Sequence, residues 1–174
     1  MSANYPDGIT AHNLGSRTSR WRFTHWIALL ILGAIMTLAL SGVLGGRANH
    51  TISHKEHGTN LRVDAPQTLR SGEFFEIGIE AWADRAIERP TIAISVPFWR
   101  NFTVNTMIPQ AEGEEASDGA FAFTYGPIEP GKKLVVKIDG QVNPTLRGGN
   151  SGWLELRDGD RAFTRIPLKL KVLP

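Results

Sequence analysis

The chain has 174 residues, five histidines and no cysteine, which excludes disulfides, thiol nucleophiles, iron–sulfur clusters and cysteine-ligated zinc. The net charge is only +2, and residues 47–174 carry sixteen basic and sixteen acidic side chains. Because binding to phosphates requires a basic face, nucleic acid is excluded as a partner.

A basic segment and a long uncharged stretch open the chain. Residues 1–25 contain three arginines and one acid, and the 21 residues 26–46 carry no formal charge. At about 1.5 Å per residue this stretch spans roughly the 30 Å of a bilayer core, so we predict a transmembrane helix over 26–46. Its arginines and aromatics predict a membrane interface at Arg17, Arg20, Trp21, Arg22 and Trp26.

The orientation of this helix follows from its flanking charges. A slight excess of arginine on the N-terminal side predicts a cytoplasmic segment 1–25 and a C-terminal part outside the membrane. The alternative is a cleaved signal peptide, since Ala39-Leu40-Ser41 resembles a cleavage site. Signal h-regions run only about 7 to 15 residues, so the length favours a retained anchor.

Small residues recur every four positions along the predicted helix. They are Gly33, Thr37, Ser41 and Gly45, and Gly42 with Gly46 adds a GxxxG pair. Residues at this spacing share one side of a helix, where a partner helix can approach closely. We therefore predict a helix-packing face toward a membrane-protein partner. The alternative explanation is that small residues are common in membrane helices.

A polar, histidine-rich segment over 47–59 is predicted to be a juxtamembrane linker. His50, His54 and His57 have the spacing i, i+4, i+7, which on a helix would bring three imidazoles to one side. Such a cluster is the chain's candidate site for copper, zinc or nickel. The glycines around the segment argue against a helix there.

Residues 60–174 change to a period of two. Apolar and polar side chains alternate over 75–82 and 91–96, and again over 166–172 after the hairpin signal Asp158-Gly159. Further strands are expected at 60–64, 102–107, 121–125, 134–139 and 153–157. About eight short strands separated by turns predict an all-β antiparallel sandwich, and Pro167 predicts an edge position for the last strand.

The segment Ile128-Glu129-Pro130-Gly131-Lys132-Lys133-Leu134-Val135-Val136-Lys137-Ile138 resembles the turn and strand of many bacterial extracytoplasmic immunoglobulin-like domains. The resemblance extends over about residues 60–173 and implies an immunoglobulin-like sandwich, not an activity. One helix followed by such a domain is also similar in outline to the Cox11-type copper chaperones. Those proteins hold copper with cysteines, which this chain lacks, so that function does not carry over.

The predicted sandwich contains neither histidine nor cysteine, so a catalytic triad, a histidine base or a histidine-bound zinc cannot be built from it. Glutamates 112, 114 and 115 lie in a predicted loop over 110–119, where solvated charge is the ordinary explanation. Phe98, Trp99 and Arg100 form a candidate partner-binding motif, because aromatics and arginine are enriched in binding hot spots. The alternative is that Trp99 fills the sandwich core.

These observations lead to one functional hypothesis and two alternatives. We expect a non-enzymatic, single-pass protein of the bacterial inner membrane whose periplasmic sandwich serves as an accessory subunit of a membrane complex. No cofactor and no small-molecule ligand are expected. The first alternative is a metal-handling or sensing protein that uses the three histidines. The second is an envelope carbohydrate-binding module that stacks Trp82 or Trp153 on a sugar ring.

Overall fold

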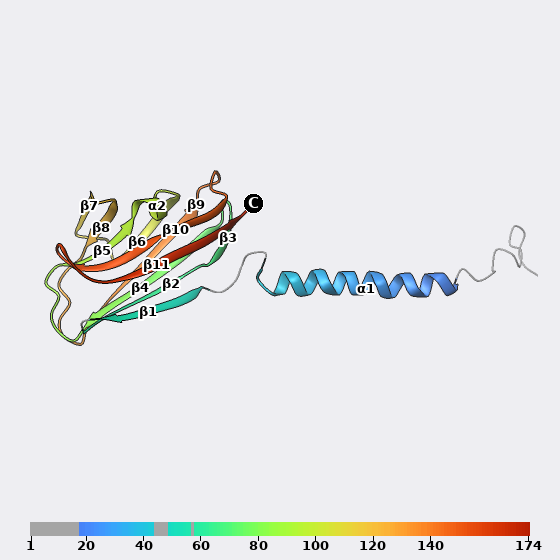
Figure 1. Cartoon of the computed structure of the whole chain (residues 1–174), viewed down its shortest axis with the longest axis horizontal. Helices are drawn as coiled ribbons and strands as arrows, with labels where there is room; N and C mark the ends of the chain where they lie inside the picture. Colours follow the sequence, from blue (N-terminus) through green and yellow to red (C-terminus); the bar gives the residue numbers. More distant parts are fainter. Residues whose placement is uncertain (1–17, 44–48, 57) are drawn as a thin grey trace, which may run out of the picture. The chain divides into compact units, whose positions relative to one another are not determined.

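The computed structural model describes residues 18–43, 49–56 and 58–174. Its contacts divide the chain into two units, Met1–Ser41 and Gly42–Pro174. Helix α1 (Thr18–Leu40) belongs to the first unit, and the second unit is an all-β sandwich with a short helix, α2 (Val96–Trp99) (Figure 1).

Helix α1 begins and ends earlier than the predicted span of 26–46. It ends at Leu40, and Gly42 follows with a φ of +68°. A glycine in this left-handed conformation commonly terminates a helix, because it has no Cβ to clash with the backbone. No helix among the described residues combines the length and the apolar character that a membrane crossing requires.

The sandwich has two hydrogen-bonded sheets. The first has the strand order β1-β2-β4-β9-β6, and the second has the order β3-β11-β10-β5-β8-β7. The first sheet consists of β1 (His50–Glu56), β2 (Thr59–Ala65), β4 (Phe74–Ala83), β9 (Lys133–Val142) and β6 (Phe102–Ile108). The second consists of β3 (Thr68–Arg70), β11 (Arg161–Leu173), β10 (Gly148–Asp158), β5 (Pro90–Ser95), β8 (Ala120–Thr124) and β7 (Gly113–Ser117).

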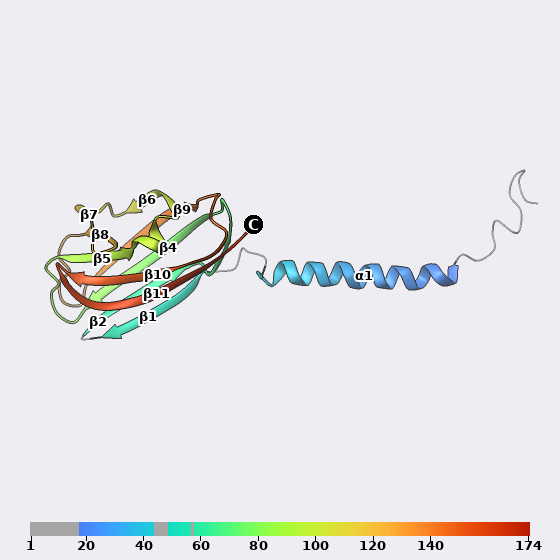
Figure 2. The ribbon, with the colours of Figure 1, turned by 45° about the horizontal axis from the view of Figure 1, so that its top comes forward.

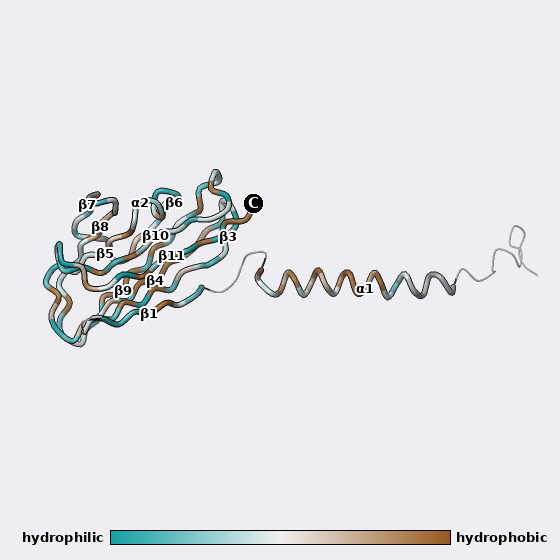
Figure 3. Tube along the Cα trace, viewed as in Figure 1, coloured by the Kyte–Doolittle hydropathy of each residue, from teal (hydrophilic) through white to brown (hydrophobic). Residues whose placement is uncertain are grey.

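The core lies between the two sheets, which Figure 2 shows as two layers. Alternate side chains face it, as the period of two predicts, and Figure 3 shows the resulting alternation of apolar and polar residues along β10 and β11. Leu61, Ile79, Val136, Leu154 and Ile166 are all fully buried. The predicted all-β, two-sheet sandwich is therefore confirmed, and it fits an immunoglobulin-like architecture. The second sheet is mixed, because β3 runs parallel to β11.

Three strands lie where no strand was predicted. β1 covers most of the expected linker 47–59 and pairs with β2, so the prediction of a linker is wrong for residues 50–56. β7 covers part of the expected acidic loop 110–119 and pairs with β8. β3 is only three residues long. All three are outermost in their sheets. A strand at this position has only one neighbouring strand and is only partly buried, so its sequence does not need a strict alternation of apolar residues.

Two hairpin turns define the register of the second sheet. Asp118 and Gly119, between β7 and β8, both have positive φ, as a type I′ turn requires. Between β10 and β11 the turn residues are Gly159 and Asp160, and only Gly159 has positive φ, the pattern of type II′. The predicted hairpin is therefore present, with its turn one residue later than Asp158-Gly159.

Pro167 lies at an open edge of the second sheet. β3 pairs only with Lys171–Leu173, and the N–H of Lys171 donates to the carbonyl of Gln67 on that side. Pro167 is four residues earlier and has the same orientation, so its missing N–H costs no hydrogen bond between strands. The predicted edge position is correct for this part of β11.

Candidate protein-interaction surface

Five residues lie side by side across the outer face of the second sheet. The register pairs Arg165 with Glu155, Glu155 with Ala93, Ala93 with Ala122 and Ala122 with Glu115. Directly paired residues of antiparallel strands point to the same face. Because Leu154 and Leu156 on either side of Glu155 are fully buried in the core, this transverse row lies on the outer face.

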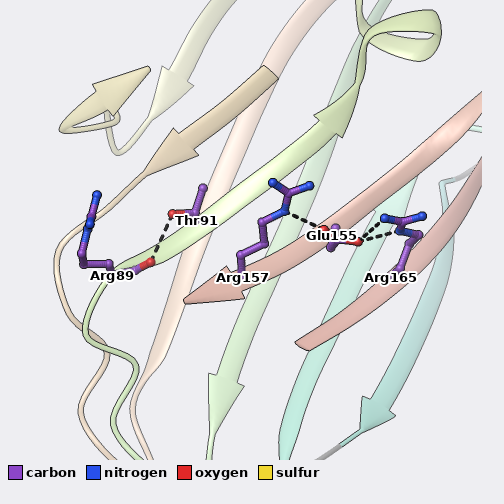
Figure 4. Close-up of polar contacts among 5 residues, drawn as sticks. All are labelled: Arg89, Thr91, Glu155, Arg157 and Arg165. Atoms are coloured by element: carbon purple, nitrogen blue, oxygen red, sulfur yellow. Dashed lines mark hydrogen bonds and ion pairs between the residues drawn. The ribbon is translucent and has the colours of Figure 1, made fainter. Parts of the chain in front are cut away.

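Glu155 is almost completely buried although it lies on this outer face. Its side chain is only 4% exposed, and two arginines bind its two carboxylate oxygens. Arg157 Nε donates to Oε1 at 2.6 Å, and Arg165 Nε donates to Oε2 at 2.6 Å. Figure 4 shows Glu155 between the two guanidinium groups. We call these three residues the arginine clamp.

Trp153 supports the outer arginine of the clamp. The guanidinium carbon of Arg165 lies 4.2 Å from the centroid of the indole ring, which is the geometry of a cation–π contact. Arg165 is therefore held by the carboxylate of Glu155 and by the indole, while its side chain remains 55% exposed. The clamp presents a charged group in one fixed orientation on the surface.

The strands β10 and β11 make one half of this face basic. Lys169 and Lys171 are exposed and share the outward direction of Arg165, since they follow it at intervals of two residues along β11. Ser151 and Gly149, their partners on β10, carry no charge. We define the basic half as Arg157, Arg165, Lys169 and Lys171.

The predicted partner-binding motif has mostly a packing role. Phe98 is 3% exposed and lies 5.1 Å from Phe102, ring centroid to ring centroid. Trp99 is partly buried and packs against Phe123 at 5.4 Å. Arg100 alone is exposed. Phe98 and Trp99 therefore both pack against the core, which is the role weighed as the alternative for Trp99. Partner binding through this motif stays a prediction.

Gly152 shows why the motif packs so closely. A Cβ at this position would lie 2.6 Å from the Cβ of Phe98, so only glycine lets β10 approach α2. The next residue, Trp153, donates its backbone N–H to Ser95 Oγ at 3.0 Å. This contact fixes the segment of β10 that carries Trp153 and Glu155.

The predicted histidine cluster is not formed by the described residues. His50 and His54 lie on the strand β1, and His57 lies outside the described residues. Four residues of strand extend about 13 Å, too far for two imidazoles to bind one ion. In the described part of the chain, no three histidine or acidic side chains lie close enough together to hold a metal. The metal site predicted on helical spacing is therefore wrong for His50 and His54.

The predicted helix-packing residues are only partly on α1. Gly33 and Thr37 lie one turn apart, and Thr37 Oγ1 donates to the carbonyl of Gly33 at 2.7 Å. Ser41 and Gly42 follow Leu40, the last residue of the helix, although the Ser41 N–H still donates to the carbonyl of Thr37 at 3.0 Å. The packing face stays a prediction. Gly45 and Gly46 lie outside the described residues.

The predicted interface residues are also placed differently. Because α1 begins at Thr18, the backbone of Arg20, Trp21 and Arg22 belongs to its first turns, and the 69% exposed Trp26 lies two turns inside the helix. Arg17 lies outside the described residues. These backbone positions therefore lie within α1, and the location of the residues at a membrane interface stays a prediction.

Tyr125 is the buried titratable group next to the acidic strand. It is 4% exposed, and its hydroxyl donates to Met107 Sδ at 3.1 Å. Burial, together with the negative charge of Glu114, raises the pKa of Tyr125 to about 12. The hydroxyl therefore stays neutral at physiological pH, which is a structural state and not that of a general base.

An apolar groove lies between β1, the outermost strand of the first sheet, and the part of β11 around Pro167 that does not pair with β3. It has a volume of about 300 Å³ and is lined by Ile52, Ala65, Pro66, Phe98, Pro167 and Leu168, with His50, Gln67 and Lys169 as polar neighbours. It lies where the sheets are not joined by hydrogen bonds.

Trp153, considered above for sugar binding, is half-buried, and Arg165 covers one face of its ring.

The residues of the clamp were not recognised in the sequence as a site. Trp153 and the alternation around it predicted a strand, but the partner of Glu155 depends on a register that a bulge shifts between Leu156 and Arg157. The available signal was an acid at an outward position flanked at i±2 by a tryptophan and an arginine.

Comparisons with known proteins identify no family. No protein-family profile and no curated protein sequence matches the chain. Among solved structures, it is similar to a non-cellulosomal cohesin from the hyperthermophilic archaeon Archaeoglobus fulgidus, with 13% identity and a TM-score of 0.35, over 63% of this chain and 88% of that one. At this level of similarity, neither a function nor a partner follows.

Proposed function

We propose that this protein is a non-catalytic, membrane-anchored interaction module that serves as an accessory subunit of a bacterial inner-membrane complex. In this proposal the uncharged stretch 26–46 anchors the chain, with residues 1–25 cytoplasmic and the sandwich periplasmic. The sandwich binds a protein partner through the face that carries the arginine clamp.

The anchor is supported by the distribution of apolar side chains on α1. Every side chain from Thr24 to Leu40 is exposed, on all sides of the helix, and Leu30 and Leu40 are 71% and 83% exposed. A helix that is apolar all round requires a lipid or protein environment to cover it. The small side at Gly33 and Thr37 is where we expect a partner helix to pack.

The observation that carries the binding role is the fixed position of Arg165. Tryptophan and arginine are enriched in interface hot spots, and immobilising a long side chain on binding costs about 0.5 to 1.5 kcal/mol. Glu155 and Trp153 have already fixed this side chain in the free protein. Its remaining guanidinium donors are available for bidentate recognition of a carboxylate.

Gentle detergent extraction of the full chain tests the binding role. We expect the wild type to elute with a bound protein. The amount of that protein that elutes with Arg165→Ala should be at least tenfold lower. The matched control is Arg62→Ala, which removes an exposed arginine from the outer face of the first sheet. A wild-type chain that elutes alone, or equal recovery with Arg165→Ala, would refute the proposal.

The anchor and its orientation are tested with one introduced cysteine. The chain has none of its own, so Thr145→Cys in an exposed loop reports a single position. We expect the protein to resist alkaline extraction and to react with a membrane-impermeant maleimide from the periplasmic side. Release by alkali would contradict the anchor, and labelling only after lysis would contradict the orientation. An intact molecular mass that matches a chain starting near Gly42 would indicate a cleaved signal peptide.

A further inference from the structure

The outer face of the second sheet carries opposite charges at its two ends. The basic half lies on β10 and β11, and exposed Glu115 lies on β7 at the other end of the transverse row. Glu112, Glu114 and Asp118 are also exposed at or next to this strand and add negative charge. Glu155, the acid within the basic half, is already neutralised by the clamp.

Small residues separate the two charged ends. Ala93 and Ala122 occupy the middle of the row, and Ser95 and Ala120 lie beside them in register. Five strands at about 4.8 Å spacing place the backbones of Arg165 and Glu115 roughly 19 Å apart, too far to pair within one chain. Glu115 therefore has no basic partner within the row, and Arg157 and Arg165 share the single negative charge of Glu155, so each end keeps a net charge. The middle of the row consists of small side chains, of which Ala93 is buried and Ala122 is half-buried.

Such a face is complementary to itself under a twofold rotation. A twofold axis that runs along the middle strand β5 at Ala93 places the two faces against each other. It brings Arg165 of one copy onto Glu115 of the other, and the same contact is made twice. The same rotation brings Glu155 against Ala122. An alanine offers a carboxylate no partner, and the clamp has already neutralised this carboxylate with two arginines.

We propose that the partner bound by this face is a second copy of the same chain, packed sheet to sheet about a twofold axis near Ala93. The inference rests on the proposed binding role of the clamp face and names its partner. Anchoring in a membrane would favour such a dimer, because both copies are confined to one layer.

Charge reversal on the full chain in detergent tests the pairing. Arg165→Glu and Glu115→Arg each place like charges at two symmetric contacts, so we expect each variant to weaken self-association by about a hundredfold or more. Mixing the two variants restores opposite charges at both contacts, because each copy then meets a partner of matching charge. The mixture should therefore dimerise as the wild type does. Wild-type chains that stay monomeric at all concentrations, or variants that dimerise normally, would overturn the inference.

Folding is controlled separately, because Arg165→Glu places a second carboxylate beside Glu155. If circular dichroism shows that this variant does not fold, Lys169→Glu takes its place, since Lys169 is exposed in the same basic half. Lys169 lies four residues, about 13 Å, along β11 from Arg165, so reversing its charge should weaken self-association by less than Arg165→Glu does. Failure of the folded Lys169→Glu variant to change self-association would count against the basic half as a dimer contact.

Cross-linking distinguishes this inference from the proposed function. Ala122→Cys lies near the axis, and Ser53→Cys, exposed on β1, is the control. With a short bismaleimide in native membranes, we expect a product of twice the chain mass from Ala122→Cys alone. A product of another mass would refute the second copy but keep the binding role. Both proposals would be refuted if this face gave no product and Arg165→Ala also recovered as much bound protein as the wild type.

Discussion

The outer faces of the two sheets carry charge in different ways. On the first sheet, Lys133 Nζ lies 3.0 Å from Glu80 Oε1 and Lys137 Nζ lies 3.3 Å from Glu76 Oε1. Glu80 is half-buried, and the other three side chains are exposed. On the second sheet, the carboxylate of Glu155 is buried between two arginines. Exposed lysines follow Arg165 along β11, and exposed glutamates lie on β7 at the other edge. Charges that alternate within a face neutralise one another in solvent, whereas segregated charges leave a field that a partner can neutralise.

Removing the buried carboxylate should have the largest effect on stability. Glu155→Gln leaves Arg157, whose side chain is 15% exposed, without its counter-charge. We expect a loss of about 3 to 4 kcal/mol in the free energy of unfolding, at the lower end for a broken buried pair because Arg165 can regain hydration. Urea denaturation measures it. The matched change on the first sheet, Glu80→Gln, should cost less than about 0.5 kcal/mol, and equal losses would contradict the comparison.

The next largest effect should come from the titration of Tyr125 at high pH, directly after β8 of the second sheet. Tyr125 has an ordinary pKa near 10 when unfolded and about 12 when folded, so the folded state disfavours its ionisation. Its contribution is intact below pH 10 and is lost as the pH rises toward 12, by about 2 to 3 kcal/mol. Because lysines also titrate there, the measurement is the difference between wild type and Tyr125→Phe across this range. A constant difference would mean that the hydroxyl is not buried in solution.

Breaking the stack beneath Arg165 should have a smaller effect. Trp153→Leu keeps an apolar side chain but removes the cation–π contact, which is worth about 0.5 to 1 kcal/mol at an exposed site. Thermal unfolding should show a loss of about that size. Arg165→Ala combined with Trp153→Leu forms a double-mutant cycle, and a coupling energy of zero would show that the two side chains act independently.

The smallest effect is expected on the first sheet. Lys137→Ala removes an exposed ion pair with Glu76, and we expect a change of no more than about 0.5 kcal/mol. Urea denaturation at low and high salt checks it, since screening should abolish even this difference. A larger, salt-independent loss would indicate that the first face is also organised by buried charge.

Strands whose apolar residues alternate were predictable, and strands that only complete an edge were not. Ile77 and Ile79, or Ile92 and Ile94, must face the core once the chain is extended, and all four are buried. β1 has only Ile52 partly buried, so its histidines suggested a linker. The turn Asp118-Gly119 was the local signal for β7, and it lay inside a segment whose glutamates suggested a solvated loop.

What the sequence determined by itself is local. The absence of cysteine, the uncharged stretch and the period of two follow from residue chemistry and need no knowledge of neighbouring strands. The tertiary structure decided which residues meet. Arg165 meets Glu155 from ten residues away, and Glu155 shares a row with Ala93 and Glu115, because two turns and one bulge set the register. A shift of one residue would turn each of these side chains to the opposite face, so their chemistry depends on pairing that no single segment specifies.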